Sequence, residues 1–313
     1  MARIFVTGGG GFIGRNVVPQ LLTQGHSVVA LQRDSNILPS LHRQLTVIHG
    51  DLRDNAASLR PALSDCDTVL HLAADTTPSR SATNLEMELR VNLSPFLNLL
   101  ELLRDTPVNR IVILSSGGTV YGRPLILPID ESHPTMPITP YGLGKLTIEH
   151  LARLWASQNG IKYILLRAAN PYGPHQLGRN NQGVIGVWLQ SALHNQPLAV
   201  WGDGKSVRDY LYVGDLAEAL SVACGHPTLE AGIYNVGSGD GKSLLQIAEM
   251  VARVTGIDPR LDFAPAKDYI IAVNVLSTKR YEAATNWRPK MDLMEGMRLT
   301  YDFLRHSSPT HRN

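Results

Sequence analysis

Four consecutive glycines near the start of the chain constrain its fold more than any other feature. They occupy positions 8–11, directly after the strand-like run 4–6 (Ile-Phe-Val), and helical apolar spacing begins at Ile13. Glycines at such a turn let the backbone approach a pyrophosphate, whose charge is stabilised at the N-terminus of the following helix. The stretch therefore predicts a dinucleotide site, with contacts at Gly8, Gly11, Phe12, Ile13 and Gly14.

Strand-like runs alternate with helical patterns along the rest of the chain. The expected strands are 26–31, 46–48, 68–72, 110–114, 161–167, 200–201 and 234–236. The expected helices are 91–103, 184–193, 215–224, 244–254 and 293–304. We therefore expect an α/β chain with a Rossmann-like doubly wound parallel sheet and a smaller C-terminal substrate-binding α/β lobe. The first lobe would span residues 1–170, and the second mainly 171–313 with some segments returning to the first.

Composition narrows the class of protein. Of the 313 residues 43% are hydrophobic and the formal net charge is +2, which gives no argument for a nucleic-acid or membrane partner. No apolar run approaches the length of a membrane span. The two cysteines, Cys66 and Cys224, form neither a disulfide framework nor a metal-ligand spacing. We therefore expect a cytoplasmic protein without a metal site.

The carboxyl end of the second strand would choose between NAD and NADP. An acidic residue there would bond the ribose 2′-hydroxyl of NAD, but the chain has Gln32 followed by Arg33. Arginine pairs with a 2′-phosphate or stacks on adenine, so this pair favours NADP while NAD stays open. The alternative is that Arg33 is a solvated surface residue. Later strand ends would flank the same cofactor through Asp51, Leu52, Leu72, Ala73 and Ala74.

The stretch with the clearest chemistry is 139–145 (Thr-Pro-Tyr-Gly-Leu-Gly-Lys). Thr139 is a good helix cap and Pro140 suits the first turn, which places Tyr141 and Lys145 on one helical face. A nearby ammonium would lower the pKa of the phenol, which could then take a proton from a sugar hydroxyl while hydride leaves the same carbon. The alternative is an amphipathic surface pair, but the glycine turn favours catalysis.

Together these motifs resemble the extended short-chain dehydrogenase/reductase family, within it the NAD(P)-dependent nucleotide-sugar epimerases and reductases similar to UDP-glucose 4-epimerase. The resemblance runs from residue 2 to about residue 304. Its carriers are the glycine turn 7–14, the strand ends 50–52 and 71–74, Asn92, the stretch 115–122 (Ser-Ser-Gly-Gly-Thr-Val-Tyr-Gly), Tyr141 with Lys145, the stretch 167–174, and the stretch 208–215.

The resemblance assigns roles to individual residues. Tyr141 would be the acid and base, and Lys145 would grip the nicotinamide ribose. Arg208 would clamp the diphosphate of the substrate, unless it pairs with Asp209 or Asp215 instead. Further cofactor contacts would be Asn92, Ser115 and Pro171, and further substrate contacts would be Asn170, Gly183 and Val184, the last two within the stretch 182–185.

The chain departs from the family pattern at the residue that usually supplies a hydroxyl to the reacting oxygen. That position, four residues before Tyr121, is Gly117. Ser116 or Thr119 would supply the hydroxyl instead, and Thr119 is the better candidate if the loop curls toward the cleft. Gly118 and Thr119 also stand where the 4,6-dehydratases of the family carry an Asp-Glu pair, so dehydratase activity is disfavoured.

Other positions bear on the substrate and on assembly. Lys267 stands near a common phosphate-binding arginine and would act as a point charge, and Ser277 replaces a common aspartate. Trp201 is either a core residue or, with the turn 201–204, a nucleotide contact. By resemblance the chain would form a homodimer through helices near 92–103 and 146–158.

Three functions remain open from the sequence. The first is a nucleotide-sugar 4-epimerase, which oxidises the sugar to a 4-keto intermediate and reduces it again on the other face. The second is an NADPH-dependent reductase of a nucleotide-linked 4-keto-6-deoxyhexose, which Gln32 and Arg33 favour. The third is a non-catalytic dinucleotide-binding protein, because a fold alone does not prove chemistry.

Overall fold

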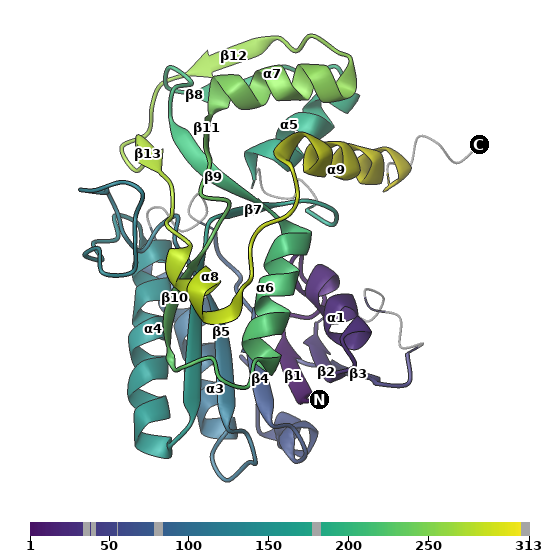
Figure 1. The fold of residues 1–313 in the computed structure, drawn as a ribbon, viewed down its shortest axis with the longest axis vertical. Coiled ribbons are helices and arrows are strands. Elements are labelled where there is room, and N and C mark those ends of the chain that lie inside the picture. Colours follow the sequence, from purple (N-terminus) through teal and green to yellow (C-terminus); the bar gives the residue numbers. More distant parts are fainter. Residues whose placement is uncertain (34–37, 39–41, 55, 78–83, 177–182, 308–313) are drawn as a thin grey trace.

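The computed structural model describes residues 1–33, 38, 42–54, 56–77, 84–176 and 183–307. Its larger lobe is built on a parallel sheet (Figure 1). In spatial order the seven strands are β10 (Gly232–Val236), β6 (Lys162–Ala168), β5 (Arg110–Ser116), β4 (Thr68–His71), β1 (Arg3–Thr7), β2 (Ser27–Gln32) and β3 (Leu45–His49). This arrangement confirms the doubly wound sheet expected from the sequence.

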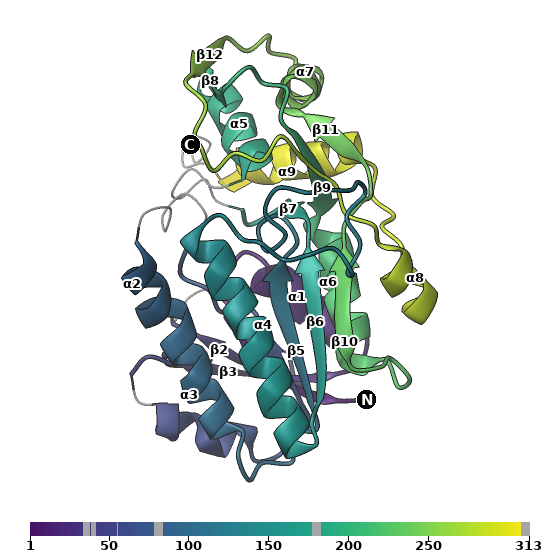
Figure 2. The same cartoon turned by 90° about the vertical axis from the view of Figure 1, so that its left-hand side faces the viewer.

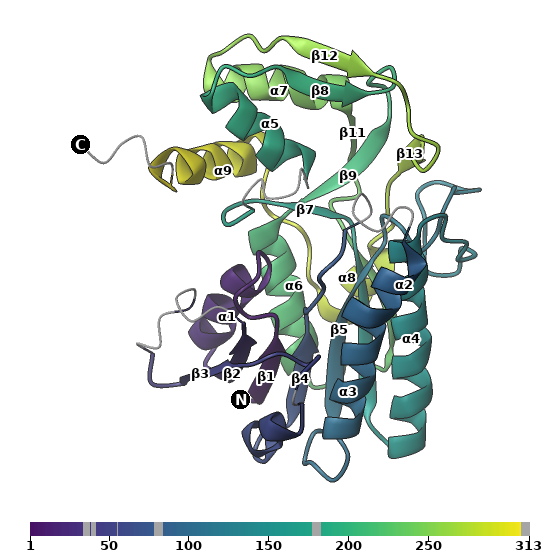
Figure 3. The same ribbon diagram turned by 180° about the vertical axis from the view of Figure 1, so that it is seen from behind.

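Helices cover both faces of this sheet. One face packs on α1 (Gly14–Thr23), α6 (Val213–Gly225) and α8 (Lys279–Thr285). The other face packs on the 3₁₀ segment η1 (Ala56–Leu63), α3 (Ser94–Leu102) and α4 (Pro140–Asn159), and α3 and α4 lie side by side in Figures 2 and 3. Apolar strand residues such as Val6 and Val112 are fully buried between the two layers, as a sheet covered on both sides requires.

The strand order reverses direction between β1 and β4, which are neighbours in the sheet. In doubly wound sheets ligands bind outside the carboxyl ends of the strands at this reversal. Here these ends are Thr7 and His71, which pair in register, and the Thr7 hydroxyl lies 2.9 Å from Nδ1 of His71. The fold thus places the glycine turn 7–14 at the expected ligand crevice.

The smaller lobe lies above the carboxyl edge of the sheet (Figure 1). It contains β7 (Asn170–Tyr172), β9 (Val207–Tyr212), β11 (Gly241–Ser243) and β13 (Val273–Asn274) in one sheet, and β8 (Leu198–Trp201) with β12 (Leu261–Ala264) in another. Its helices are α5 (Val184–Leu193), α7 (Leu244–Thr255) and α9 (Leu293–Ser307), which pack against one another. Three late segments, α6, β10 and α8, return to the large lobe.

The region before α3 differs from the single helix expected over 91–103. The chain forms a short helix α2 (Leu85–Glu88), then a π-helical turn η2 (Leu89–Leu93), and only then α3.

Pro19 lies inside α1 without ending it. No helix among the described residues is long and apolar enough to cross a membrane.

Candidate active site

The glycine turn is shaped by close backbone approach. A Cβ at Gly14 would lie 2.3 Å from the carbonyl oxygen of Gly8, so only glycine lets α1 begin this close to the turn. Gly8 itself has φ of +74°, and a Cβ there would lie 2.9 Å from the backbone nitrogen of Ala73. Both positions therefore require glycine, for backbone conformation and for packing.

A cavity of about 230 Å³ opens beside this turn. Most of the predicted cofactor contacts line it: Gly8, Gly11, Gln32, Arg33, Asp51, Leu52, Leu72, Ala73, Ala74 and Asn92. Phe12, Ile13, Gly14, Ser115, Tyr141, Lys145 and Pro171, which were also predicted, do not line it. The structure thus brings together the strand ends around one pocket, and places the catalytic pair outside it.

Charged side chains at this pocket neutralise one another. Arg33 donates to both carboxylate oxygens of Asp75 at 2.7 Å, and its guanidinium lies 3.9 Å from Asp51. Arg53 contacts the same two carboxylates. We call these four residues the strand-end charge cluster; its formal charge is zero. Arg33 is therefore ion-paired rather than merely solvated.

Three buried side-chain atoms at the pocket have no hydrogen-bond partner among the described residues. Both amide atoms of Gln32 and Nε2 of His71 are buried and unpartnered among the described residues. Burial lowers the pKa of His71 to about 3, with a smaller contribution from the Lys145 charge, so its ring is neutral. Buried polar groups normally have partners, so these atoms fit a bound dinucleotide, which offers hydroxyls and phosphates.

Tyr141 and Lys145 occupy the first turns of α4, as the sequence predicted. Thr139 caps the helix by accepting a hydrogen bond from the backbone nitrogen of Gly142. The ammonium of Lys145 lies 5.8 Å from the centre of the Tyr141 ring and donates to the carbonyl of Leu114 at 3.1 Å. The pair therefore stands at the carboxyl end of β5, fixed by both the helix and the sheet.

The electrostatics of this pair correct one expectation. Burial raises the pKa of the Tyr141 phenol, and the charge of Glu88 raises it further. Burial lowers the pKa of Lys145 to about 8, against the opposing charges of Glu88 and Glu149. The lowered tyrosine pKa expected from the neighbouring Lys145 is therefore not found in this structure, because burial and the charge of Glu88 raise that pKa.

The missing family hydroxyl at Gly117 has a steric cause. A Cβ at this position would lie 2.5 Å from Cδ1 of Leu276. The hydroxyl of Thr119 is buried without a partner among the described residues. The Cβ of Thr119 lies 3.2 Å from where a Cβ at Gly142 would stand, one residue from Tyr141. Ser116, the other candidate, is the half-buried last residue of β5.

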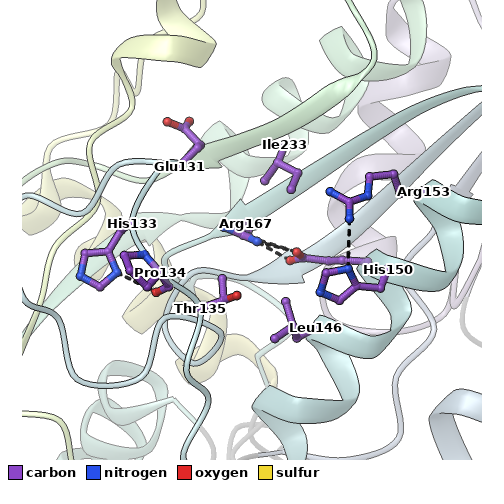
Figure 4. A pocket seen from close by; sticks show the side chains of 10 residues that line it. Glu131, His133, Pro134, Thr135, Leu146, His150, Arg153, Arg167 and Ile233 are labelled. Atoms are coloured by element: carbon purple, nitrogen blue, oxygen red, sulfur yellow. Dashed lines mark hydrogen bonds and ion pairs between the residues drawn. The ribbon is translucent and has the colours of Figure 1, made fainter.

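Ser115 points away from the cofactor pocket toward a buried ion pair. Its hydroxyl donates to Glu149, and Glu149 also accepts two close hydrogen bonds from Arg167, at 3.0 and 2.7 Å. The pair lines a second cavity of about 210 Å³ together with His150 and Arg153, and Figure 4 shows Arg167, His150 and Arg153 around it. Ser115 therefore contributes to the support of α4 rather than to a ligand surface.

Arg208, in the smaller lobe, forms no ion pair among the described residues. Its only hydrogen bond among the described residues is to the carbonyl of Val207, and burial lowers its pKa. Asp209 instead accepts from Ser238 and the backbone nitrogens of Gly239 and Leu276. Asp215 accepts from a backbone nitrogen beyond α8. Neither carboxylate pairs with Arg208, so the salt-bridge alternative is wrong.

Strand β9 carries Arg208 over the end of β5. Asn274 pairs with Arg208 in register, and its side-chain nitrogen donates to the carbonyl of Gly117 at 3.1 Å. Asn170 lies on the same side, because its Oδ1 would be 3.6 Å from a Cβ at Gly118. Arg208 is thus paired in register with a residue whose side chain contacts the loop that precedes the catalytic helix.

The remaining predicted substrate residues lie in different places. Gly183 and Val184 form the N-terminus of α5, where Gly183 has φ of +80° and packs against Gln176; Gln182 lies outside the described residues. Lys267 stacks on Trp201, with its ammonium 3.7 Å from the ring centre. Trp201 is 41% exposed and so is not a core residue. The two form one exposed cation–aromatic unit.

Known proteins resemble this chain over its whole length. Residues 4–237 match the family described as "NAD dependent epimerase/dehydratase family". The chain belongs to this family. A putative UDP-glucose 4-epimerase of Methanocaldococcus jannaschii is 31% identical, over 98% of this chain and 100% of that protein.

Solved structures of the family agree with the fold. A Thermus thermophilus UDP-glucose 4-epimerase in complex with NAD superimposes with a TM-score of 0.89 and 34% identity, covering 98% of this chain and 100% of that one. A Thermotoga maritima UDP-glucose 4-epimerase with UDP-glucose gives a TM-score of 0.90 and 29% identity, covering 97% and 99%. As a member of this family the chain is an NAD-dependent sugar-nucleotide enzyme of the extended short-chain type.

Sequence reasoning missed three residues of this epimerase-family site. Asp75 and Arg53 line the cofactor pocket, each directly after a predicted contact at a strand end. Their positions were a usable signal, because neighbours at a carboxyl edge share its crevice. Glu88, which faces the catalytic pair, gave no such signal, since it lies inside an expected loop before an expected helix.

Proposed function

We propose that this chain is an NAD-dependent nucleotide-sugar 4-epimerase that interconverts UDP-glucose and UDP-galactose. The carrying observation is the Tyr141–Lys145 pair at the carboxyl end of β5, together with Arg208 on strand β9 of the smaller lobe, which forms no ion pair among the described residues. A bare guanidinium in the second lobe suits a diphosphate, because arginine binds it bidentately. The names of the relatives, and the NAD and UDP-glucose in the two solved structures, support the same assignment.

The side chains act as follows in this proposal. Tyr141 accepts the proton of the C4 hydroxyl while the C4–H bond breaks, and a 4-keto sugar forms. When bound, NAD would supply the hydride chemistry at C4 in both directions. Lys145 holds the nicotinamide ribose and stabilises the phenolate. After the keto sugar turns over in the site, Tyr141 returns the proton to the C4 oxygen, which gives the other epimer with no net redox change.

We assign the additional hydroxyl to Thr119 rather than Ser116. Its Oγ1 is buried without a partner among the described residues, and its Cβ lies next to the α4 turn of Tyr141. A buried unpaired hydroxyl costs stability unless a ligand satisfies it. The C4 oxygen of the substrate would do so.

We further propose NAD as the working cofactor. The sequence favours NADP because a free arginine at position 33 would bind a 2′-phosphate. Arg33 instead pairs with Asp75 near Asp51, so a phosphate there would meet two carboxylates. The unpartnered amide of Gln32 suits a ribose hydroxyl.

One experiment tests the function directly. The freshly purified protein is denatured to identify any released dinucleotide, and native protein is incubated with UDP-galactose while UDP-glucose is measured. We expect stoichiometric NAD and conversion without added reductant, because a cofactor regenerated in each cycle need not leave. Consumption of NADPH with a nucleotide-linked 4-keto-6-deoxyhexose, and no epimerisation, would establish the reductase instead. No turnover of either substrate would leave the non-catalytic binding protein.

We also propose that two copies pair through the outer faces of α3 and α4. These neighbouring helices and the adjoining α2 and η2 expose five large apolar side chains: Leu85, Leu89, Leu97, Leu143 and Leu154. Such an apolar surface is typical of an interface. Light scattering of the wild-type chain should give a dimer mass, and a Leu97→Asp/Leu154→Asp variant should give a monomer.

The two cysteines bear on the compartment. Cys66 and Cys224 are free and buried, and burial raises the pKa of both thiols, so the unreactive thiol form dominates. This agrees with a reducing setting, and we propose that the enzyme works in the cytoplasm. Localisation of a tagged chain in its own cells tests this.

A further inference from the structure

Glu88 is a buried carboxylate that the mechanism above does not use. It ends α2, directly before the π-helical turn η2, and its side chain is 1% exposed. Thr76 donates to one carboxylate oxygen at 2.7 Å, and the side-chain nitrogen of Asn92 donates to the other at 2.6 Å. Among the described residues no cation forms an ion pair with it. A buried charge without a counterion is costly and so calls for a functional reason.

Gly144 brings this carboxylate against the catalytic turn. A Cβ at Gly144 would lie 2.5 Å from Cγ of Glu88 and 2.6 Å from its Oε1. Gly144 stands between Tyr141 and Lys145 on α4, so the missing side chain leaves room for Glu88 beside both. The backbone φ of Gly144 is not positive, which means that close approach, and not backbone conformation, is what glycine serves here.

A second buried carboxylate, Glu149, provides the contrast. It lies one turn after Lys145 on α4, but Arg167 neutralises it through paired hydrogen bonds (Figure 4). The third titratable group near Lys145 is His71 on β4, which is neutral because burial lowers its pKa to about 3. Glu88 is therefore the group that delivers net negative charge to the pair.

We propose that Glu88 is a positioning residue whose buried carboxylate, set against Gly144 on the catalytic turn, keeps the side chain of Lys145 in its ammonium form. This rests on the proposed function, because it presumes that Tyr141 and Lys145 carry the reaction. The direction agrees with the electrostatics. The charge of Glu88 raises the pKa of Lys145 against the lowering effect of burial, and it raises the pKa of Tyr141 in addition to the effect of burial. Thr76 and Asn92 hold the carboxylate in place.

The test compares Glu88→Gln with Glu88→Asp. Glutamine keeps the shape and the hydrogen bonds, because its oxygen can accept from Asn92 and its nitrogen can donate to the Thr76 hydroxyl. Aspartate keeps the charge but shortens the side chain. Glu86→Gln, an exposed site on the same helix, is the control for removing one charge.

We expect the pH profile of kcat to separate these variants. In Glu88→Gln the alkaline limb of the profile, where Lys145 loses its proton, should move to lower pH, by about one to two pH units for a charge lost at close range. The reason is that the pKa of Lys145, about 8 in this structure, falls when Glu88 is neutral. Glu88→Asp and Glu86→Gln should keep the wild-type limits.

A second readout needs no turnover. Trace labelling of the Lys145 amine with acetic anhydride, followed against pH by mass spectrometry, reports its titration in each variant. The pH midpoint of labelling should fall by about one to two pH units in Glu88→Gln. It should stay at the wild-type value in Glu88→Asp and Glu86→Gln. If both readouts superimpose on the wild type, or if Glu88→Asp is the more impaired variant with unshifted limbs, Glu88 is a packing residue and the proposal fails. Inactive wild-type protein with a shifted labelling midpoint would instead contradict the proposed function alone.

Discussion

The charges of the strand-end charge cluster are paired with one another, whereas within the described part of the chain Lys145, Glu88 and Arg208 are not, although Glu149 further along the catalytic helix pairs with Arg167. In the cluster two arginines and two aspartates pair with one another at the mouth of the cofactor pocket. Around the catalytic helix, Lys145, Glu88 and Arg208 form no ion pair among the described residues, and the Thr119 hydroxyl has no hydrogen bond.

The paired cluster therefore recognises a ligand mainly by shape, whereas the unpaired groups recognise it by forming the interactions that they lack. Mutually paired charges gain little from a ligand, because each would exchange one partner for another. Unpaired buried groups gain much, because binding removes a desolvation cost already present in the free protein. Substitutions around the catalytic helix should therefore change activity strongly, and substitutions in the cluster weakly.

Tyr141→Phe should produce the largest effect. It removes only the phenolic oxygen, which transfers the proton, so kcat for epimerisation should fall by about 100- to 10,000-fold. NAD affinity should change little, since the ring stays in place. A coupled UDP-glucose assay and a fluorescence titration with NAD measure the two quantities, and Tyr301→Phe on α9 is the control. Retained activity would remove the catalytic helix from the proposal.

Arg208→Met should weaken substrate binding without weakening the fold. Loss of a charged hydrogen-bond donor to the diphosphate costs about 1.5–3 kcal/mol, or about 10- to 100-fold in KM. The free energy of unfolding should stay the same or rise, because a half-buried guanidinium without a carboxylate partner is removed.

Urea unfolding and steady-state kinetics give both numbers for Arg208→Met. Arg298→Met, an exposed position on α9, should change neither. A large loss of stability in Arg208→Met would show that this arginine supports the smaller lobe, and would break the distinction between unpaired and paired cations.

The regular lobe could be predicted from the sequence, and particular elements show why. The strands β1, β4 and β5 are short apolar runs bounded by turn signals, so their existence follows from local pattern. The π-helical turn 89–93 could not be predicted, because the 3.6-residue pattern of Val91 to Leu103 continues through it. The sheet formed by β7, β9, β11 and β13 has strands of two to six residues, too short for a periodic signal.

Some features of the site could likewise be predicted from the sequence, and others could not. The glycine turn, Gln32 and the Tyr141–Lys145 spacing are contiguous motifs, and each was located from the sequence. Which charges pair was not, because the ion pair of Arg33 with Asp75 joins residues 42 positions apart. The raised pKa of Tyr141 comes from burial and from Glu88, whose approach requires the tertiary contact at Gly144. Motifs identify the functional groups, but only the fold sets their charge.

Thr119→Val and Ser116→Ala together test the hydroxyl assignment. Valine keeps the shape of threonine, so kcat should fall by about tenfold through loss of one hydrogen bond to the reacting oxygen, while stability stays unchanged or rises. Ser116→Ala should have a smaller effect. Thr119→Ser, which keeps the hydroxyl, should restore most of the rate. The reverse order of effects would assign the hydroxyl to Ser116.

Asp75→Asn should give the smallest change, and it tests whether pairing in the charge cluster sets the cofactor. It leaves Arg33 and Arg53 with one carboxylate between them, so the cluster gains a positive charge that a 2′-phosphate can use. NADP affinity should rise by about two- to fivefold relative to NAD, the scale of an exposed ion pair, and the gain should shrink at high salt. Asp65→Asn, which breaks a surface pair with Arg3 at the opposite strand ends, is the matched control. If Asp75→Asn leaves the ratio of the two affinities unchanged, mutual pairing is not what excludes the phosphate, and the selection lies with Gln32.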